Sequence, residues 1–217
     1  MGTESFLEKK SRAQKILKAL KKNYPSRGTA LRFESNFQLL VSVILSAQCT
    51  DSRVNMITKE LFKKLKAPKD FALISQDEIE KMVYSTGFYR AKARNIKAMA
   101  KKLVSDFGSR VPDTMGELLS LQGVARKTAN VVLQEGFGKT EGIVVDTHIK
   151  RVSHRLGLTS TINPEKAEKE LMEIFPKKEW RNVGDVFIWH GRKVCFARKP
   201  SCEKCSIKEL CPSAFLP

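Results

Sequence analysis

Four of the five cysteines lie close together near the end of the 217-residue chain. They form the run C-x6-C-x2-C-x5-C, made of Cys195, Cys202, Cys205 and Cys211. Four thiolates at this spacing can hold one tetrahedral zinc ion or one iron–sulfur cluster. Disulfides are the alternative, but they are typical of small secreted chains, and the charged N-terminus lacks the apolar region of an export signal. The clustering predicts a metal centre, and the spacing leaves zinc and [4Fe–4S] both open.

Three further residues of metal-binding type stand apart from this run. Cys49 lies near an apolar helical stretch and is expected to be a small buried side chain. His148 and His190 can each ligate a metal, but four cysteines already complete a site. We therefore expect both histidines to make polar contacts.

Two apolar helical patterns meet at a glycine turn within residues 114–133. Thr114 and Glu117 suit the start of a first short helix, Gly123 breaks it, and a second helix begins by about Ala125. Backbone N–H groups at such a turn and helix start can bind a phosphate without reading base sequence. The segment therefore predicts a helix-hairpin-helix DNA-binding element, and an ordinary helical corner is the alternative.

A candidate nucleophile lies in the first turn of that second helix. The helix dipole disfavours a cation at this place, so Lys127 is suited to react as a neutral amine. Asp146 follows the apolar pair Val144-Val145 and precedes a helix that ends near Leu156. It is expected to be either a plain N-cap or a carboxylate that orients an amine and moves its proton.

The chain carries 40 Lys and Arg against 23 Asp and Glu, a formal net charge of +17. Three segments hold nearly all of this excess: residues 1–28 (+6), 88–110 (+6) and 190–217 (+4). Such patches suit a polyanion, because each neutralised phosphate releases a condensed counterion. A hydrophobic content of 41% excludes a disordered basic tail, and the longest apolar run, 39–45, is too short to cross a bilayer. The composition favours a folded nucleic-acid-binding protein over a merely solvated basic surface.

The elements that must position these residues are predicted to be helices. Apolar side chains recur at helical spacing within four segments: 13–20, 54–65, 96–107 and 164–175. Pro68 is expected to end the second of them, Ser75 and Glu78 form a capping-box pattern, and Asn163-Pro164 suits a helix start. No alternating apolar and polar runs suggest a hairpin, so an all-α, compact fold is expected.

One of these helices combines an apolar face with a basic face. Arg90, Arg94, Lys97 and Lys101 are spaced 4, 3 and 4 residues apart, which stacks them along one side. We expect this side to contact DNA phosphates.

Three motifs in this order resemble the endonuclease III family, the bifunctional DNA glycosylase/AP lyases of the helix-hairpin-helix superfamily. They are Leu-Gln-Gly-Val-Ala-Arg-Lys-Thr-Ala-Asn-Val-Val-Leu at 121–133, Val-Asp-Thr-His at 145–148 and the run from Cys195 to Cys211. Shorter matches occur at 45–51, 86–93 and 190–192. The resemblance covers nearly the whole chain, from about Phe37 to Cys211.

The resemblance implies base excision repair of double-stranded DNA that holds damaged pyrimidines or abasic sites. A damaged base is flipped into a pocket, and Lys127 attacks the sugar C1′, expels the base and forms a Schiff base. β-Elimination then cuts the strand on the 3′ side, and Asp146 activates the amine. Family substrates are oxidised or ring-saturated pyrimidines such as thymine glycol. We expect a monomer without membrane partners, and, because no organelle-targeting stretch is apparent, a place in the cytoplasm at the nucleoid of a bacterium or archaeon.

The resemblance also implies DNA contacts and a cofactor. Gln48 matches the residue that fills the hole left by the flipped nucleotide, and Phe88 sits where the family has an apolar wedge. Without the family, Gln48 reads as a polar residue at a helix end and Phe88 as core. Further contacts are expected from the hairpin, the second motif and the cysteine loop: Gly123, Ala125, Arg126, Thr147, His148, Arg198 and Lys199. The four cysteines match ligands of a [4Fe–4S] cluster, which shapes the basic loop and takes no part in the chemistry.

The implied fold has two helical lobes. One is the six-helix lobe 29–139, with its helix-hairpin-helix motif at about 114–134. The other joins 1–28 to 140–217 and holds the cluster at 195–211. The family's hairpin usually reads Pro-Gly-Val-Gly, whereas this chain has Gln122-Gly123-Val124-Ala125. We therefore expect a freer turn and a strained Ala125, if that position requires a positive φ.

Two alternatives remain at this point. The related adenine-specific mismatch glycosylases share the cluster spacing and the aspartate, but they typically lack the lysine and carry a further C-terminal domain. A non-catalytic, zinc-stabilised DNA-binding protein would bind DNA without cutting it and would contain no iron.

Overall fold

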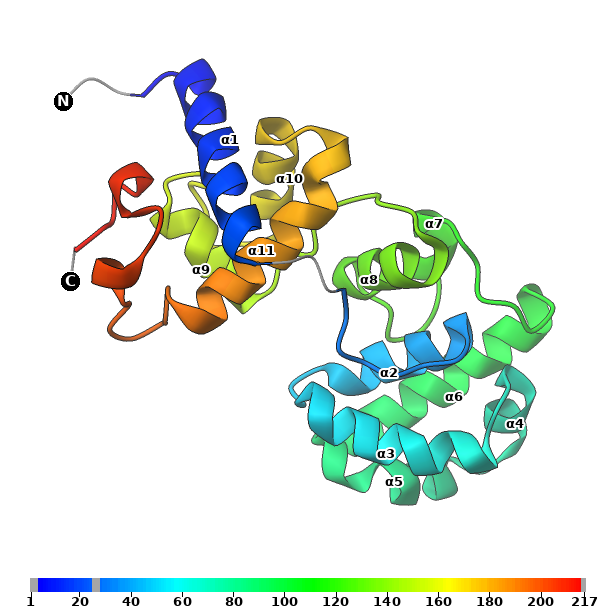
Figure 1. The fold of residues 1–217 in the computed structure, drawn as a ribbon. Coiled ribbons are helices and arrows are strands. Elements are labelled where there is room, and N and C mark those ends of the chain that lie inside the picture. The colour runs from blue at the N-terminus through cyan, green and yellow to red at the C-terminus, as the bar shows by residue number, and fades with distance from the viewer. Residues whose placement is uncertain (1–3, 25–27, 216–217) are drawn as a thin grey trace. The chain divides into compact units, whose positions relative to one another are not determined.

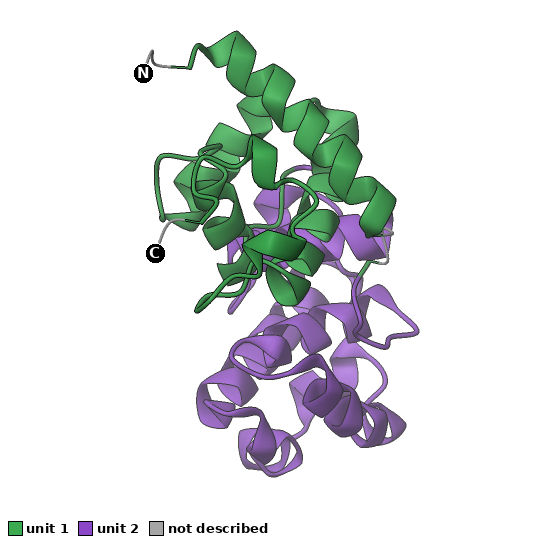
Figure 2. Ribbon diagram, turned by 60° about the vertical axis from the view of Figure 1, so that its left-hand side comes forward, with its two compact units in different colours: residues 1–28, 142–217 green, residues 29–141 purple. Residues whose placement is uncertain are grey.

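The structure is a computed structural model that describes residues 4–24 and 28–215, and these residues form helices and loops without a strand (Figure 1). The all-α prediction is confirmed. The chain divides into two compact units, coloured separately in Figure 2. Unit 1 comprises residues 1–28 and 142–217, and unit 2 comprises 29–141. Among the described helices, none has the length and apolarity needed to span a membrane.

Unit 2 is built around a helix that is buried on every side. Its α-helices are α2 (Asn36–Ser46), α3 (Asp51–Lys64), α4 (Pro68–Leu73), α5 (Gln76–Val83), α6 (Tyr89–Asp106), α7 (Met115–Leu119) and α8 (Arg126–Phe137), with a 3-10 helix η1 (Tyr84–Thr86). Every residue of α2 from Phe37 to Leu45 is buried, since this run is apolar around nearly its whole circumference. Helices α3, α6 and α8 pack against α2, and α4 and α5 pack against α6.

Local signals fixed most helix ends in unit 2. Ser75 Oγ accepts a hydrogen bond from Glu78 N at 3.3 Å and the Glu78 carboxylate accepts one from Ser75 N at 3.2 Å, so the predicted capping box is present. Helix α6 ends at Asp106, and Gly108 follows with φ +56°, a conformation that glycine commonly adopts after the end of a helix. Pro68 differs from expectation: α3 already ends at Lys64, and Pro68 is the first residue of α4, a helix that the periodicity did not reveal.

Unit 1 joins the N-terminal helix to the C-terminal part of the chain. It contains α1 (Phe6–Asn23), α9 (Thr147–Arg155), α10 (Pro164–Ile174), α11 (Trp180–Lys193) and the 3-10 helices η2 (Lys177–Glu179), η3 (Cys202–Lys204) and η4 (Lys208–Leu210). The buried residues of α1 are the predicted stripe, Ala13, Ile16, Leu17 and Leu20, and α1 packs against α10 and α11. Asn163 caps α10 with Pro164 at its first position, as predicted.

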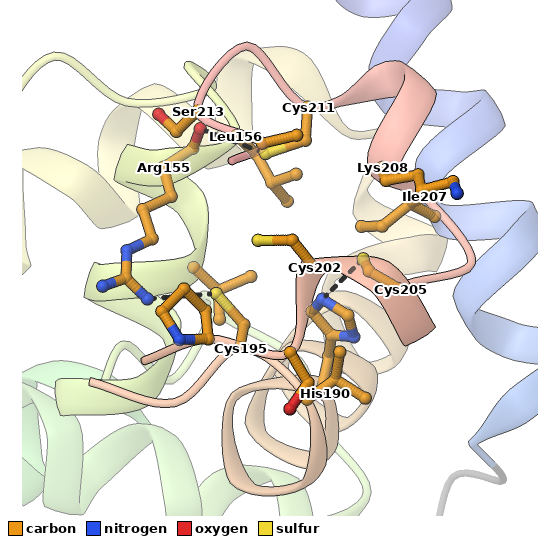
Figure 3. A pocket seen from close by; sticks show the side chains of 15 residues that line it. Arg155, Leu156, His190, Cys195, Cys202, Cys205, Ile207, Lys208, Cys211 and Ser213 are labelled. Atoms are coloured by element: carbon orange, nitrogen blue, oxygen red, sulfur yellow. Dashed lines mark hydrogen bonds between the residues drawn. The ribbon is translucent and has the colours of Figure 1, made fainter. Parts of the chain in front are cut away.

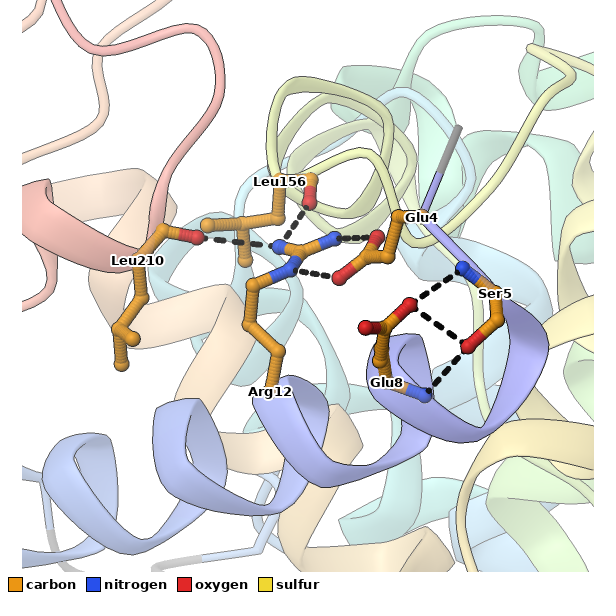
Figure 4. Close-up of polar contacts among 6 residues, drawn as sticks. All are labelled: Glu4, Ser5, Glu8, Arg12, Leu156 and Leu210. Atoms are coloured by element: carbon orange, nitrogen blue, oxygen red, sulfur yellow. Dashed lines mark hydrogen bonds and ion pairs between the residues drawn. The ribbon is translucent and has the colours of Figure 1, made fainter. Parts of the chain in front are cut away.

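A half-buried arginine ties α1 to the cysteine segment (Figure 4). Arg12 donates hydrogen bonds to the carbonyl oxygens of Leu156 (2.7 Å) and Leu210 (3.0 Å), which lie just after α9 and at the end of η4. Its guanidinium also pairs with Glu4, and this holds the pKa of the Glu4 carboxyl below its usual value. One of the basic residues of the N-terminal segment is therefore used within the protein.

Candidate functional site

The hairpin of unit 2 has the predicted geometry. Thr114 caps α7, Gly123 turns the chain with φ +80°, and α8 starts at Arg126. Ala125 is the N-cap of α8 with φ −88°, so no positive φ is needed there and the expected strain at Ala125 does not arise. Because alanine brings no side-chain acceptor, no side chain caps the start of α8.

Gly123 is required for two reasons: its positive φ and the close approach of α6. A Cβ at this position would lie 2.8 Å from the Cβ of Asn95. We expect Gly123→Ala to destabilise the chain by about 2–4 kcal/mol, measured by chemical unfolding, and to weaken DNA binding by the hairpin. Gly116→Ala is the matched control, because Gly116 lies in α7 of the same hairpin with open space around it. Equal stability of the two variants would contradict this account of the turn.

Lys127 is the second residue of α8 and is exposed to solvent. Within the described residues, no hydrogen bond or ion pair holds its side chain. The amine is therefore presented to the outside directly after the turn, while Arg126 beside it is half-buried. This exposure is what a nucleophile for a large substrate requires.

Asp146 in unit 1 is the N-cap of α9, so the predicted capping interaction is present. Its Oδ1 accepts hydrogen bonds from His148 N (2.8 Å) and Ile149 N (2.9 Å). Only this oxygen caps the helix, and in the described part of the chain nothing donates to Oδ2. A half-buried carboxylate with one fixed oxygen and one available oxygen can both orient a group and accept a proton.

The two histidines make the expected polar contacts. His148 Nδ1 lies 3.2 Å from a nitrogen of the Arg151 guanidinium, and Thr147 beside it is exposed. His190 is buried, with Nδ1 3.4 Å from Tyr24 Oη and Nε2 3.7 Å from Cys205 Sγ. Burial lowers the pKa of His190 to about 4, so the ring is neutral at neutral pH.

The two candidate wedge residues of unit 2 are exposed and have unusual backbones. Gln48 has φ +53° and Phe88 has φ +48°, a region that bulky residues rarely adopt. Phe88 is 69% exposed, so the core interpretation of this residue is wrong. Residues held in sparsely populated backbone conformations cluster at binding and catalytic sites.

Only part of the predicted basic face of α6 is free to contact a ligand. Lys97 donates hydrogen bonds to the carbonyl oxygens of Ala72 (3.2 Å) and Ile74, at the end of α4, and so caps that helix instead of facing a ligand. Arg90 lies 3.9 Å from the Glu80 carboxylate. Arg94 and Lys101 are exposed. The prediction of four equivalent phosphate-binding cations is therefore wrong for Lys97.

Sequence reasoning missed Lys92, which counts toward the basic surplus but lies inside unit 2. Its ammonium donates hydrogen bonds to the carbonyl oxygens of Leu45 (2.8 Å) and Thr86 (2.6 Å). Burial lowers the pKa of Lys92. The signal was present, because Lys92 is spaced four residues from Ile96 and seven from Met99, on the apolar stripe of α6.

The four clustered cysteines surround one pocket in unit 1 (Figure 3). The rest of its lining is mostly apolar, with Val152, Leu156, Val194 and Ile207 among the side chains and no carboxylate. Burial raises the pKa of the Cys205 and Cys211 thiols. In the described residues no three His, Cys, Asp or Glu side chains are grouped to hold a single metal ion. Four soft donors around an apolar pocket fit an iron–sulfur cluster.

Two arginines of α9 hold the loop that follows Cys195, and the sequence reasoning missed them. Arg151 donates hydrogen bonds to the carbonyl oxygens of Gly191 (2.9 Å) and Cys195 (3.0 Å). Arg155 donates to those of Phe196 (2.6 Å) and Ala197 (3.0 Å) and lies 3.4 Å from Cys195 Sγ.

The next two residues of this loop, Arg198 and Lys199, are exposed, and Lys199 has φ +50°. The loop closed by Cys195 and Cys202 thus presents two cations. This is the arrangement expected of a basic loop pinned at its ends.

Comparison with known proteins identifies both the segment that holds the hairpin and the cysteine segment. Residues 41–177 match the HhH-GPD superfamily of base excision DNA repair proteins, and residues 195–211 match the iron–sulfur binding domain of endonuclease III. The second match begins and ends at a clustered cysteine. It confirms the expected [4Fe–4S] cofactor over zinc.

Close relatives cover almost the whole chain. Endonuclease III of Synechocystis is 50% identical over 95% of this chain and 94% of its own length, and that of Bacillus subtilis is 42% identical over 87% and 86%. A trapped covalent intermediate of endonuclease III with DNA superimposes with a TM-score of 0.88 at 39% identity, covering 99% of this chain and 98% of that one. A thermostable thymine-DNA glycosylase gives 0.82 at 25% identity, over 94% and 97%. The chain therefore belongs to the endonuclease III family of HhH-GPD DNA glycosylase/AP lyases.

Proposed function

We propose that this DNA-binding glycosylase and AP lyase of base excision repair excises oxidised or ring-saturated pyrimidines, such as thymine glycol, and cuts abasic sites. The observation that carries the proposal is Lys127, an exposed and unpaired amine directly after the Gly123 turn. We further propose that the enzyme acts as a monomer in a bacterial cytoplasm, at the nucleoid. The bacterial origin of its relatives supports this placement.

Lys127 acts as the nucleophile in this proposal. Its neutral amine attacks C1′ of the damaged nucleotide, and the bond from C1′ to the base breaks as the base leaves with the electron pair and takes up a proton. The attached amine then loses one proton, and the C1′–O4′ bond breaks as O4′ takes up a proton, which leaves a protonated Schiff base between C1′ and Lys127. Removal of a C2′ proton pushes electrons toward C3′ and expels the 3′ phosphate, which cuts the strand.

Asp146 is the proton acceptor in this proposal. Its Oδ1 is occupied by two backbone N–H groups, and this fixes the orientation of the carboxylate. Oδ2 accepts the proton that Lys127 must lose, and the negative charge stabilises positive charge on the opening sugar. The capping role and the catalytic role are therefore carried by different oxygens of the same residue.

Cys195, Cys202, Cys205 and Cys211 are the proposed ligands of the cluster. When bound, the cluster would join the chain at these four cysteines, and it would supply no group that reacts with DNA. Arg198 and Lys199, on the loop between the first two ligands, contact phosphates. Gln48 and Phe88 enter the duplex, and the remaining contacts come from Gly123, Ala125, Arg126, Thr147 and His148.

A panel of four duplexes tests the substrate proposal. They contain thymine glycol, a preformed abasic site, an adenine mismatch or no damage, and each is incubated with the wild-type chain under single-turnover conditions. We expect strand cleavage at the first two and borohydride trapping of a covalent complex on both. Cleavage confined to the adenine mismatch would instead support the mismatch-glycosylase alternative.

A further inference from the structure

Two residues of unit 2 have a left-handed backbone conformation that their residue types, glutamine and phenylalanine, rarely adopt. Gln48 follows the end of α2 with φ +53°, and Phe88 precedes α6 with φ +48°. Neither is glycine, and Phe88 is mostly exposed, so its own packing does little to hold this conformation. A backbone of this kind persists only when its surroundings determine it. The question is which group does so here.

The segments that carry these residues pass one another closely. A Cβ on Gly87, which has φ +64°, would lie 3.9 Å from the carbonyl oxygen of Gln48, at van der Waals distance. Gly87 is the direct neighbour of Phe88 in the chain. The backbones bearing Gln48 and Phe88 are therefore adjacent, although 40 residues separate them in sequence.

Lys92 links these two segments from inside. One of its carbonyl partners, Leu45 at 2.8 Å, lies three residues before Gln48, and the other, Thr86 at 2.6 Å, lies two residues before Phe88. The Leu45 carbonyl belongs to the last turn of α2, where backbone oxygens lack a helical partner. Lys92 is only 5% exposed. A buried ammonium is costly unless its hydrogen bonds are made, and these two charge-assisted bonds fix both segments to one atom.

We propose that Lys92 is a positioning residue whose ammonium ties the end of α2 to the end of η1 and so holds Gln48 and Phe88 as one preformed wedge for the duplex. This rests on the proposed function, in which these two residues enter the DNA at the flipped nucleotide. Because the wedge is ordered before DNA binds, no conformational entropy is lost in ordering it when the lesion is recognised. Lys92 itself does not touch DNA.

The same helix offers a matched control. Lys97 also lies in α6 and also donates hydrogen bonds to two carbonyl oxygens, those of Ala72 and Ile74. These carbonyls end α4, far in sequence from both wedge residues. Losing Lys97 removes the same kind of contact without releasing the wedge.

The test compares Lys92→Met with Lys97→Met and the wild type. Two quantities are measured: the ratio of affinities for a duplex with an abasic-site analogue and for an undamaged duplex, and the single-turnover rate on thymine glycol. For Lys92→Met we expect both to fall by about 10- to 100-fold, because the wedge is misplaced. Affinity for undamaged DNA, which depends on phosphate contacts, should be unchanged. Lys97→Met should stay within about threefold of wild type on both measures, as a distant variant should.

A double-mutant comparison separates positioning from general stability. In a chain that already carries Gln48→Ala and Phe88→Ala, adding Lys92→Met should lower the affinity ratio and the single-turnover rate by less than about threefold. The reason is that Lys92 acts through the two side chains that are already missing. Lys92→Arg, which keeps a cationic donor, should recover most of the lesion preference and also serves if Lys92→Met does not fold. Additive losses, equal effects of the two methionine variants, or an unimpaired Lys92→Met would overturn the role of Lys92. A wild-type chain without activity on thymine glycol or abasic DNA would instead overturn the proposed function.

Discussion

Replacing Lys127 with alanine is expected to abolish both borohydride trapping and strand cleavage on abasic-site DNA. The loss should be on the order of 10⁴-fold or more in single-turnover rate, because the variant lacks the atom that forms the covalent bond. Affinity for the same duplex should change little, since one exposed cation among many phosphate contacts contributes a small share of binding. Denaturing gels after borohydride treatment measure the covalent complex, and filter binding measures the affinity.

Lys59→Ala is the control for this experiment. Lys59 is also an exposed lysine on a helix of unit 2, α3, so its removal changes the charge by the same amount without touching the hairpin. It should trap and cleave like the wild type. A Lys127→Ala chain that still forms the covalent complex would refute the assignment of the nucleophile.

Replacing Cys205 with serine should remove the iron from the protein and destabilise unit 1 by at least about 4 kcal/mol, as expected when a structural metal site is lost. Cys205 lines the pocket beside the buried His190, so its replacement removes one of the four points at which a cluster would join this segment. DNA affinity should fall as well, because the loop with Arg198 and Lys199 is then fixed at fewer points. Iron analysis, chemical unfolding and DNA titration measure the three effects.

Cys49→Ser provides the matched control, because Cys49 is a half-buried cysteine of unit 2 outside the pocket. Its iron content should equal that of the wild type. Full iron content in Cys205→Ser, or zinc as the only metal of the wild type purified without oxygen, would contradict the proposed ligand set.

Structural features that depend only on residues close together in the sequence were predictable. The apolar stripe of α1, the capping box at Ser75 and the cap at Asn163 depend on residues three or four positions apart, and the structure has all three. The position of Lys127 in the first turn of α8 follows from the same kind of local rule. Motif resemblance added the family, which spacing alone could not give.

Features that depend on distant backbone oxygens were not predictable. Lys97 was grouped with exposed cations because helical periodicity assigns a face, whereas its partners at Ala72 and Ile74 are 25 and 23 residues away. Arg155 reaches carbonyls more than 40 residues along the chain. Without the resemblance, no sequence pattern shows that Phe88 lies outside the core with a left-handed backbone, since large side chains seldom adopt one.

Helix α9 sets the distance between two features of unit 1. Asp146 caps its first turn, while Arg151 and Arg155 near its other end hold the backbone that leads to Arg198 and Lys199. Its nine residues span about 13 Å at 1.5 Å per residue. The carboxylate and the loop that carries Arg198 and Lys199 are thus held at a fixed separation by one helix, and inserting one residue would turn one end by about 100° relative to the other. The length of this helix is therefore constrained at both of its ends, while Ile149 and Val152 between them are buried in the core of unit 1.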